Sequence, residues 1–230
     1  MLNYFYDPTY IIILPAILFA LFAQARVSSA FNKYRTVYSR RGLTAREVAR
    51  QILDDNGLFH VTVEPINGKL TDHFDPRANV VRLSEAVYDS PSVASIGIAA
   101  HEVGHAIQHA NGYAPIKIRN AVIPVANFGS SLSMPLVIAG LIFSFQPLIT
   151  AGIFLFTFVV FFQAVTLPVE FNASSRALKT LDQYHILEED ELKKARSVLT
   201  AAALTYVASL LSSLLSLLRL IILSNSRRRN

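Results

Sequence analysis

Four long apolar segments alternate with polar sequence along the chain. They cover about residues 10–25, 121–145, 147–169 and 199–223. A helix needs about 20 apolar residues to cross a bilayer, so we expect four transmembrane helices, the first of them slightly short. Only Gln146-Pro147 separates the second segment from the third, which predicts a helical hairpin. The polar stretches 30–118 and 170–197 then form the part of the protein outside the membrane.

The first polar stretch begins with the pattern of an amphipathic helix. Residues 43–56 have helical periodicity, with Thr44 in the position of an N-cap. Glu47 follows three residues later, as in a capping box, and Gly57 stands where the helix would end. We therefore predict a helix over 43–56.

Short strands and a second helix are predicted further along. Residues 61–63 and 80–83 are apolar and β-branched, which is typical of strands. The stretch 67–76 between them contains glycine, aspartate and proline and predicts turns. Residues 91–110 read as an apolar helix that ends near Gly112.

Charge near the first apolar segment predicts its orientation. Asp7 precedes it without any lysine or arginine, whereas a secretory signal peptide begins with a basic region. We therefore expect a retained helix. Basic residues then follow it at Arg26, Lys33, Arg35, Arg40, Arg41, Arg46 and Arg50. The positive-inside rule places this side in the cytoplasm and the N-terminus outside. Four crossings put the C-terminus outside, where Arg227, Arg228 and Arg229 do not fit the rule. Either the last segment re-enters or lies in the interface, or the charge bias is outvoted, and we keep four crossings.

Composition agrees with a membrane protein and excludes several chemistries. Hydrophobic residues make up 52% of the 230 residues and charged residues 16%, too apolar a balance for an ordinary soluble domain. The chain has no cysteine, which excludes disulfides, thiolate metal sites and cysteine nucleophiles. Its net charge of +5 comes largely from basic residues beside apolar segments, so we assign it to topology and lipid contact. No nucleic-acid motif accompanies it, and we expect no nucleic-acid partner.

The chemistry-bearing motif is His101-Glu102-Val103-Gly104-His105. Residues four apart lie on one face of a helix, so both imidazoles can reach one Zn²⁺, while Glu102 lies beside the metal as a general base. Such a motif also occurs by chance on solvated helices. Here it lies in an apolar helix, where two histidines and a carboxylate are costly to bury without a metal or partner.

A catalytic zinc needs a third protein ligand and an open position for water. His109 is eight residues after His101, about 12 Å along a helix at ~1.5 Å per residue, too far to share the ion unless the helix breaks. It is better explained as a positive charge at the helix C-terminus. Glu170 is the better candidate, because it stands where the third apolar segment meets polar sequence and the hairpin returns it to the same side. A simple interfacial carboxylate is the alternative.

Three segments carry a family resemblance: HEVGHAIQH at 101–109, DHFDPRANVVRLS at 72–84 and PVEFNASSRA at 168–177. Over nearly the whole chain the sequence resembles the YugP-type neutral zinc metallopeptidases of bacteria. More distantly it is similar to the HtpX and CAAX-prenyl-protease group of membrane gluzincins. The resemblance implies one Zn²⁺ per chain, held by His101, His105 and Glu170. It also implies Glu102 as the general base of an endopeptidase that cleaves unfolded or membrane proteins.

The resemblance also gives expectations for the surrounding residues. Ser174 stands where the distant group has an aspartate, so it would orient a ligand more weakly, and Asn172 would share that task. Residues 79–83, with Asn79, Val80, Val81 and Arg82, are expected as an edge strand that binds extended substrate, with an ordinary sheet strand as the alternative. His73 and Arg176 are candidate oxyanion stabilisers. Asp72 and Asp75 either orient a histidine or form a turn.

The expected fold is therefore mainly α, with four transmembrane helices and a small α+β zincin-like domain facing the cytoplasm of a bacterial cell membrane. We treat residues 1–230 as one metalloprotease unit. The resemblance implies a stomatin-like scaffold protein as a partner, and the serines of the last apolar segment are compatible with a homo-oligomer. A non-catalytic metal-binding scaffold or adaptor is the main alternative function. A transporter or channel is disfavoured because the apolar segments carry almost no charge except Arg219.

Overall fold

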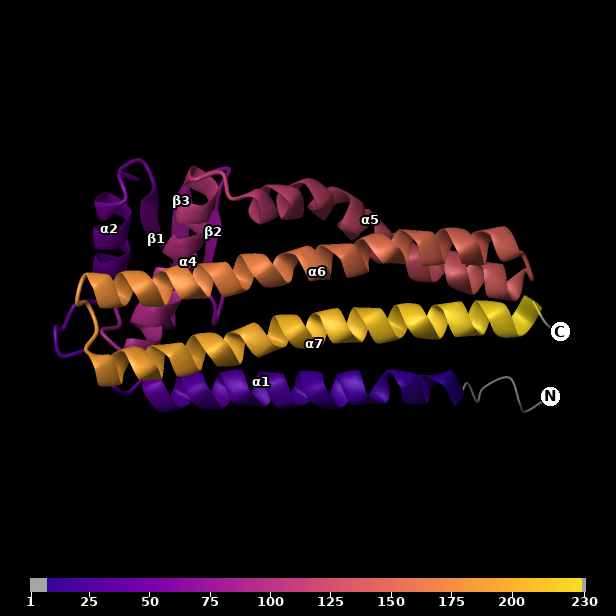
Figure 1. Cartoon of the computed structure of the whole chain (residues 1–230), viewed down its shortest axis with the longest axis horizontal. Coiled ribbons are helices and arrows are strands. Elements are labelled where there is room, and N and C mark those ends of the chain that lie inside the picture. The colour runs from indigo at the N-terminus through magenta and orange to yellow at the C-terminus, as the bar shows by residue number, and fades with distance from the viewer. Residues whose placement is uncertain (1–7, 229–230) are drawn as a thin grey trace. The chain divides into compact units, whose positions relative to one another are not determined.

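The computed structural model describes residues 8–228, with side chains described over 9–225. The predicted orientation rests partly on Asp7, Arg229 and the side chains of Arg227 and Arg228. These lie outside the part of the chain that the structure describes. The described chain consists of long helices and one small sheet (Figure 1). The mainly α class with a small α+β portion is confirmed.

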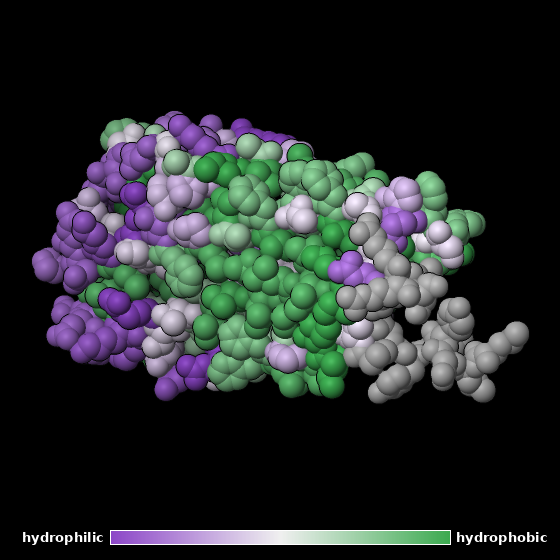
Figure 2. Space-filling view, turned by 45° about the vertical axis from the view of Figure 1, so that its right-hand side comes forward, coloured by the Kyte–Doolittle hydropathy of each residue, from purple (hydrophilic) through white to green (hydrophobic). Residues whose placement is uncertain are grey.

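Four helices are long and apolar enough to cross a membrane. They are α1 (Leu14–Tyr34), which follows the short 3-10 helix η2 (Pro8–Ile12), α5 (Ala114–Ile142), α6 (Gln146–Gln183) and α7 (Glu189–Arg228). Many of their apolar side chains are exposed, for example Leu21 of α1 by 64% and Phe154 of α6 by 61%. Figure 2 shows hydrophobic side chains gathered over these helices. Such surface is stable against lipid, so the protein is a membrane protein.

The helices extend well beyond the apolar segments. The third segment was expected to end at residue 169, yet α6 continues to Gln183, and α7 begins ten residues before the fourth segment. Pro124, Pro135 and Pro168 lie inside helices without ending them. Hydropathy marks the lipid-exposed part of a helix rather than its ends, which explains why the expected boundaries were too narrow.

The described chain divides into two compact units. One is built from the sequence up to Ala23, Ile118–Leu167 and the sequence from Thr205; the other joins Gln24–Lys117 with Pro168–Leu204. In the first unit α5 and α6 form the predicted hairpin and approach closely. A Cβ added to Gly129 would lie 2.6 Å from the carbonyl oxygen of Leu155, so the close approach requires glycine there. In the same unit Arg219 is buried, donates to Thr9 and lies 3.8 Å from the ring centroid of Tyr10.

The second unit contains α2 (Ala45–Asp55), β1 (Thr62–Ile66), β2 (His73–Asp75), β3 (Val80–Ser84), α3 (Glu85–Tyr88) and α4 (Val93–Ala110). The predicted capping box of α2 is confirmed: the Thr44 hydroxyl accepts from the Glu47 amide, and the Glu47 carboxylate accepts from the Thr44 amide. Gly57 follows the end of α2 with φ +72°, and Gly112 follows α4 with φ +62°. Hydrophobic residues of α2, β3 and α4 form its core, Ile52, Leu83 and Ile96 among them.

The sheet has the order β1-β3-β2, with β1 parallel and β2 antiparallel to β3. Two expectations were wrong here. The stretch 67–76 was expected to form only turns, but residues 73–75 are a strand. Residues 79–83 were expected at an edge, but β3 is the central strand, so its hydrogen-bonding groups face two neighbours and the open edges belong to β1 and β2.

Candidate metal centre

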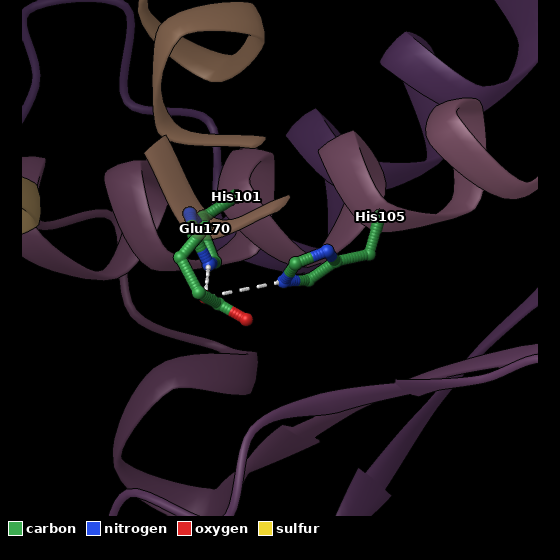
Figure 3. Close-up of side chains that lie close together, drawn as sticks. All are labelled: His101, His105 and Glu170. Carbon is green, nitrogen blue, oxygen red and sulfur yellow. Dashed lines mark hydrogen bonds and ion pairs between the residues drawn. The ribbon is translucent and has the colours of Figure 1, made fainter. Parts of the chain in front are cut away.

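Helix α4 brings two imidazoles together in the buried part of the second unit. Its apolar face is formed by Ala99, Ala100 and Val103, all at most 1% exposed, which fixes the helix against the core. His101 and His105 are four residues apart and so leave the helix on one side. Their ring centroids are 4.8 Å apart with the planes nearly perpendicular. This arrangement directs both rings toward one point (Figure 3).

Glu170 of α6 completes the group. Its Oε2 lies 3.2 Å from Nε2 of His101 and 3.5 Å from Nε2 of His105. The side chain of Glu170 is only 4% exposed, and the ligand atoms of the three residues all lie within 4.8 Å of one another. The structure therefore brings together the three residues predicted as ligands. Glu170 comes 69 positions after His101 in the sequence.

Gly104 explains how α6 can come this near. A Cβ added at Gly104 would lie 2.8 Å from the carbonyl oxygen of Ala173, a distance that real Cβ atoms essentially never show. The missing side chain lets the backbone of α6 cross α4 between the two histidines. The backbone that approaches Gly104 carries Glu170 one turn earlier.

The outer nitrogen of each imidazole has its own partner. Nδ1 of His101 lies 3.0 Å from Oγ of Ser174, and Nδ1 of His105 lies 3.0 Å from Oε1 of Gln108. A hydrogen bond at Nδ1 leaves Nε2 free to act as a ligand and holds the ring plane. Both Nε2 atoms consequently face the Glu170 carboxylate.

These residues fit a zinc ion. Two neutral imidazoles and one carboxylate are a catalytic zinc set, with a fourth position left for water or substrate. Burial disfavours the charged form of His105, but the hydrogen bond to Glu170 and the charges of Glu102 and Glu170 outweigh burial and raise the pKa of His105. The group therefore favours a positive charge among its members, either a proton or a metal cation.

Glu102 lies on α4 between the two histidines in sequence and is half-buried. Its negative charge is one of the causes that raise the pKa of His105. His109 is exposed and lies outside the group, with its ring 5.9 Å from that of Phe74 on β2. This agrees with His109 not being the third ligand.

The remaining candidates have other contacts. The ring of His73 lies between Thr71 and Arg82, with Nδ1 2.8 Å from the Thr71 carbonyl oxygen and Nε2 3.4 Å from a guanidinium nitrogen of Arg82. Arg176 donates to the side-chain oxygen of Asn172. Roles for His73 and Arg176 at an oxyanion stay predictions.

The two aspartates of the upstream segment contact neither of the metal-site histidines by a hydrogen bond that the structure records. Asp75 accepts from the amides of Arg77 and Ala78 and so forms a turn. Asp72 accepts from the amide and hydroxyl of Ser84, and burial raises its pKa despite these bonds. Both interactions fix the ends of strands.

The sequence analysis did not identify Gln108 as a site residue and missed its contact with His105. The available signal was its position, three residues after His105 on the same helix, where side chains meet.

Comparison with known proteins places the chain in a family. Residues 9–225 match the family described as "Putative neutral zinc metallopeptidase". A relative described as "Putative membrane protease YugP", from Bacillus subtilis (strain 168), is 48% identical over 212 residues, which cover 92% of this chain and 94% of the relative. No solved structure matches. The family implies zinc, and His101, His105 and Glu170 are residues suited to hold it. The chain thus belongs to the family described as "Putative neutral zinc metallopeptidase".

Proposed function

We propose that the protein is a zinc-dependent membrane endopeptidase of the HExxH type that hydrolyses peptide bonds of unfolded or membrane proteins. The observation that carries the proposal is the convergence of His101, His105 and Glu170, with Glu102 beside them on α4. We assign one zinc to each chain, because the three side chains supply one set of ligands. A non-catalytic scaffold has no need of Glu102, whereas hydrolysis requires a base in that place.

When bound, zinc would polarise the scissile carbonyl and lower the pKa of water toward about 7. The chain's own residues then perform the proton transfers. Glu102 accepts a proton from the attacking water and delivers it to the nitrogen of the leaving amine. Water adds to the carbonyl carbon, the C–N bond breaks, and the products are a carboxylate and an amine.

The substrate strand is proposed at β2 rather than at residues 79–83. β2 is an edge strand of the sheet and packs near α4 through the rings of Phe74 and His109. An extended peptide can pair with an open edge through main-chain hydrogen bonds. β1 is a poorer edge, because Pro65 has no N–H to donate.

We further propose a bacterial cell membrane as the location, with the site facing the cytoplasm. Its support is the run of basic residues after the first apolar segment together with the positive-inside rule. A stomatin-like partner and a homo-oligomer stay predictions.

Metal removal tests the proposed function. We expect detergent-purified protein to cleave a fluorescently labelled, unfolded casein, to lose this activity on treatment with 1,10-phenanthroline, and to regain it with added Zn²⁺. The matched sample receives the non-chelating isomer 1,7-phenanthroline and should keep its activity. Hydrolysis that survives complete removal of zinc would contradict the proposal, whereas zinc binding without any hydrolysis would favour the scaffold.

A further inference from the structure

Gln108 is a buried amide that the proposed chemistry does not itself use. Its side chain is fully buried on α4, one turn after His105. An amide without hydrogen bonds is costly in such a place. Gln108 instead contacts three groups: Nδ1 of His105 at 3.0 Å, the carbonyl oxygen of Val169 at 2.8 Å and Oδ1 of Asn172 at 3.0 Å. Both hydrogens of the amide and its oxygen are therefore used.

These contacts allow only one orientation of the amide. The Val169 carbonyl can only accept, so the NH₂ group of Gln108 must face it. Asn172 likewise presents its oxygen, because the same atom accepts from the Arg176 guanidinium at 2.7 Å, and a guanidinium only donates. Oε1 of Gln108 consequently faces His105. Because an amide oxygen only accepts, Nδ1 of His105 must carry a hydrogen, and Nε2 is left as the ligand atom.

The same side chain also fixes the position of Glu170. Val169 precedes Glu170 and Asn172 follows it by two residues, so the two donor bonds of Gln108 hold both sides of the turn that bears the carboxylate. The main chain of Gln108 is held as well, since its carbonyl accepts from the amide of Tyr113 after the end of α4. One residue thereby links a ligand of α4 to a ligand of α6.

We infer that Gln108 is the positioning residue of the metal centre: it sets the tautomer of His105 and, through Val169 and Asn172, the place of Glu170. This inference rests on the metal site of the proposed function. Replacement of such an outer partner of a metal-bound histidine typically lowers metal affinity by about 10- to 100-fold. Because Gln108 acts on two ligands, we expect Gln108→Met to fall in that range.

The test measures zinc affinity of the full-length protein in detergent, by competition with a chromogenic chelator, independently of activity. Gln108→Met keeps the length of the side chain and removes all three hydrogen bonds. Ser95→Ala is the matched control, since Ser95 is also fully buried on α4 but bonds to Ser92. We expect Ser95→Ala to lower the unfolding temperature and leave zinc affinity unchanged. Gln108→Glu keeps an acceptor for His105 but sets its second oxygen against the acceptors of Val169 and Asn172, so it separates the contact with His105 from the contacts with α6.

A spectroscopic measurement separates positioning from mere packing. In long-range ¹H–¹⁵N spectra of histidine-labelled, zinc-loaded protein, we expect His105 to show a protonated Nδ1 in wild type and in Gln108→Glu. In Gln108→Met we expect that proton signal to be lost to exchange.

Equal zinc affinity in wild type and Gln108→Met would overturn the inference. If Gln108→Met does not fold, Asn172→Ala decides, because it removes one acceptor of the amide and touches neither histidine. Weaker zinc binding by up to about 10-fold supports the inference, and unchanged binding overturns it. Absence of zinc from wild type would instead refute the proposed function.

Discussion

Replacing Glu102 with glutamine is expected to lower the rate of casein hydrolysis by about 10²- to 10⁴-fold, the usual contribution of a general acid–base group. Glutamine is nearly isosteric but cannot accept a proton at neutral pH. Glu102 is not among the three side chains that form the metal group, so the zinc content of Glu102→Gln should equal that of wild type. The measurement is kcat on the labelled substrate together with zinc per chain on the same preparation.

Glu85→Gln provides the comparison for Glu102→Gln, because Glu85 is an exposed carboxylate in the first turn of α3. It should keep wild-type activity. Two results would count against the role of Glu102: a fully zinc-loaded Glu102→Gln protein with more than about a tenth of wild-type activity, or loss of zinc along with activity. The first would place the base elsewhere, since a loss below the usual range is too small for the only base.

Replacing Glu170 with alanine is expected to weaken zinc binding by more than about 100-fold. This exceeds the loss of affinity that follows when a residue that only hydrogen-bonds to a metal ligand is replaced. Glu170 supplies the only carboxylate of the three-residue group in the described chain, and its loss leaves two imidazoles on one helix. Peptidase activity should fall with zinc occupancy. Chelator competition measures the affinity, and activity at saturating Zn²⁺ shows how much is recovered.

Glu191→Ala is the control for the effect of removing a buried carboxylate. Glu191 is buried like Glu170, but its carboxylate accepts from the amides of Arg40 and Glu188 at the start of α7. We expect Glu191→Ala to unfold at a lower temperature while it keeps its zinc affinity. If both variants lose zinc to the same extent, instability rather than ligand loss explains the result, and the assignment of Glu170 fails.

Local chemistry made part of the fold predictable from sequence. The capping box of Thr44 and Glu47 fixes the start of α2, and the four-residue spacing of His101 and His105 fixes their common face. Both depend on neighbours within one helical turn, so no tertiary information is needed. Glu170 was predictable for a different reason, because a carboxylate at the end of an apolar segment has few stable alternatives.

Features that depend on distant contacts were missed. β2 has only three residues and is stabilised by pairing with β3, so its own sequence predicts turns. The central place of β3 follows from the same pairing. Gln108 reads as an ordinary polar residue, since its partners Val169 and Asn172 are more than 60 positions away. Tertiary packing overrides local preference at each of these points.

The most direct test of the metal centre is the zinc K-edge X-ray absorption spectrum of zinc-loaded wild-type protein in detergent. The account predicts scattering from two imidazole rings with Zn–N distances of about 2.0–2.1 Å, oxygen ligands at about 2.0–2.2 Å and no sulfur. It also predicts that the oxygen contribution decreases in Glu170→Ala. A spectrum with one imidazole or none would contradict a site formed by His101, His105 and Glu170.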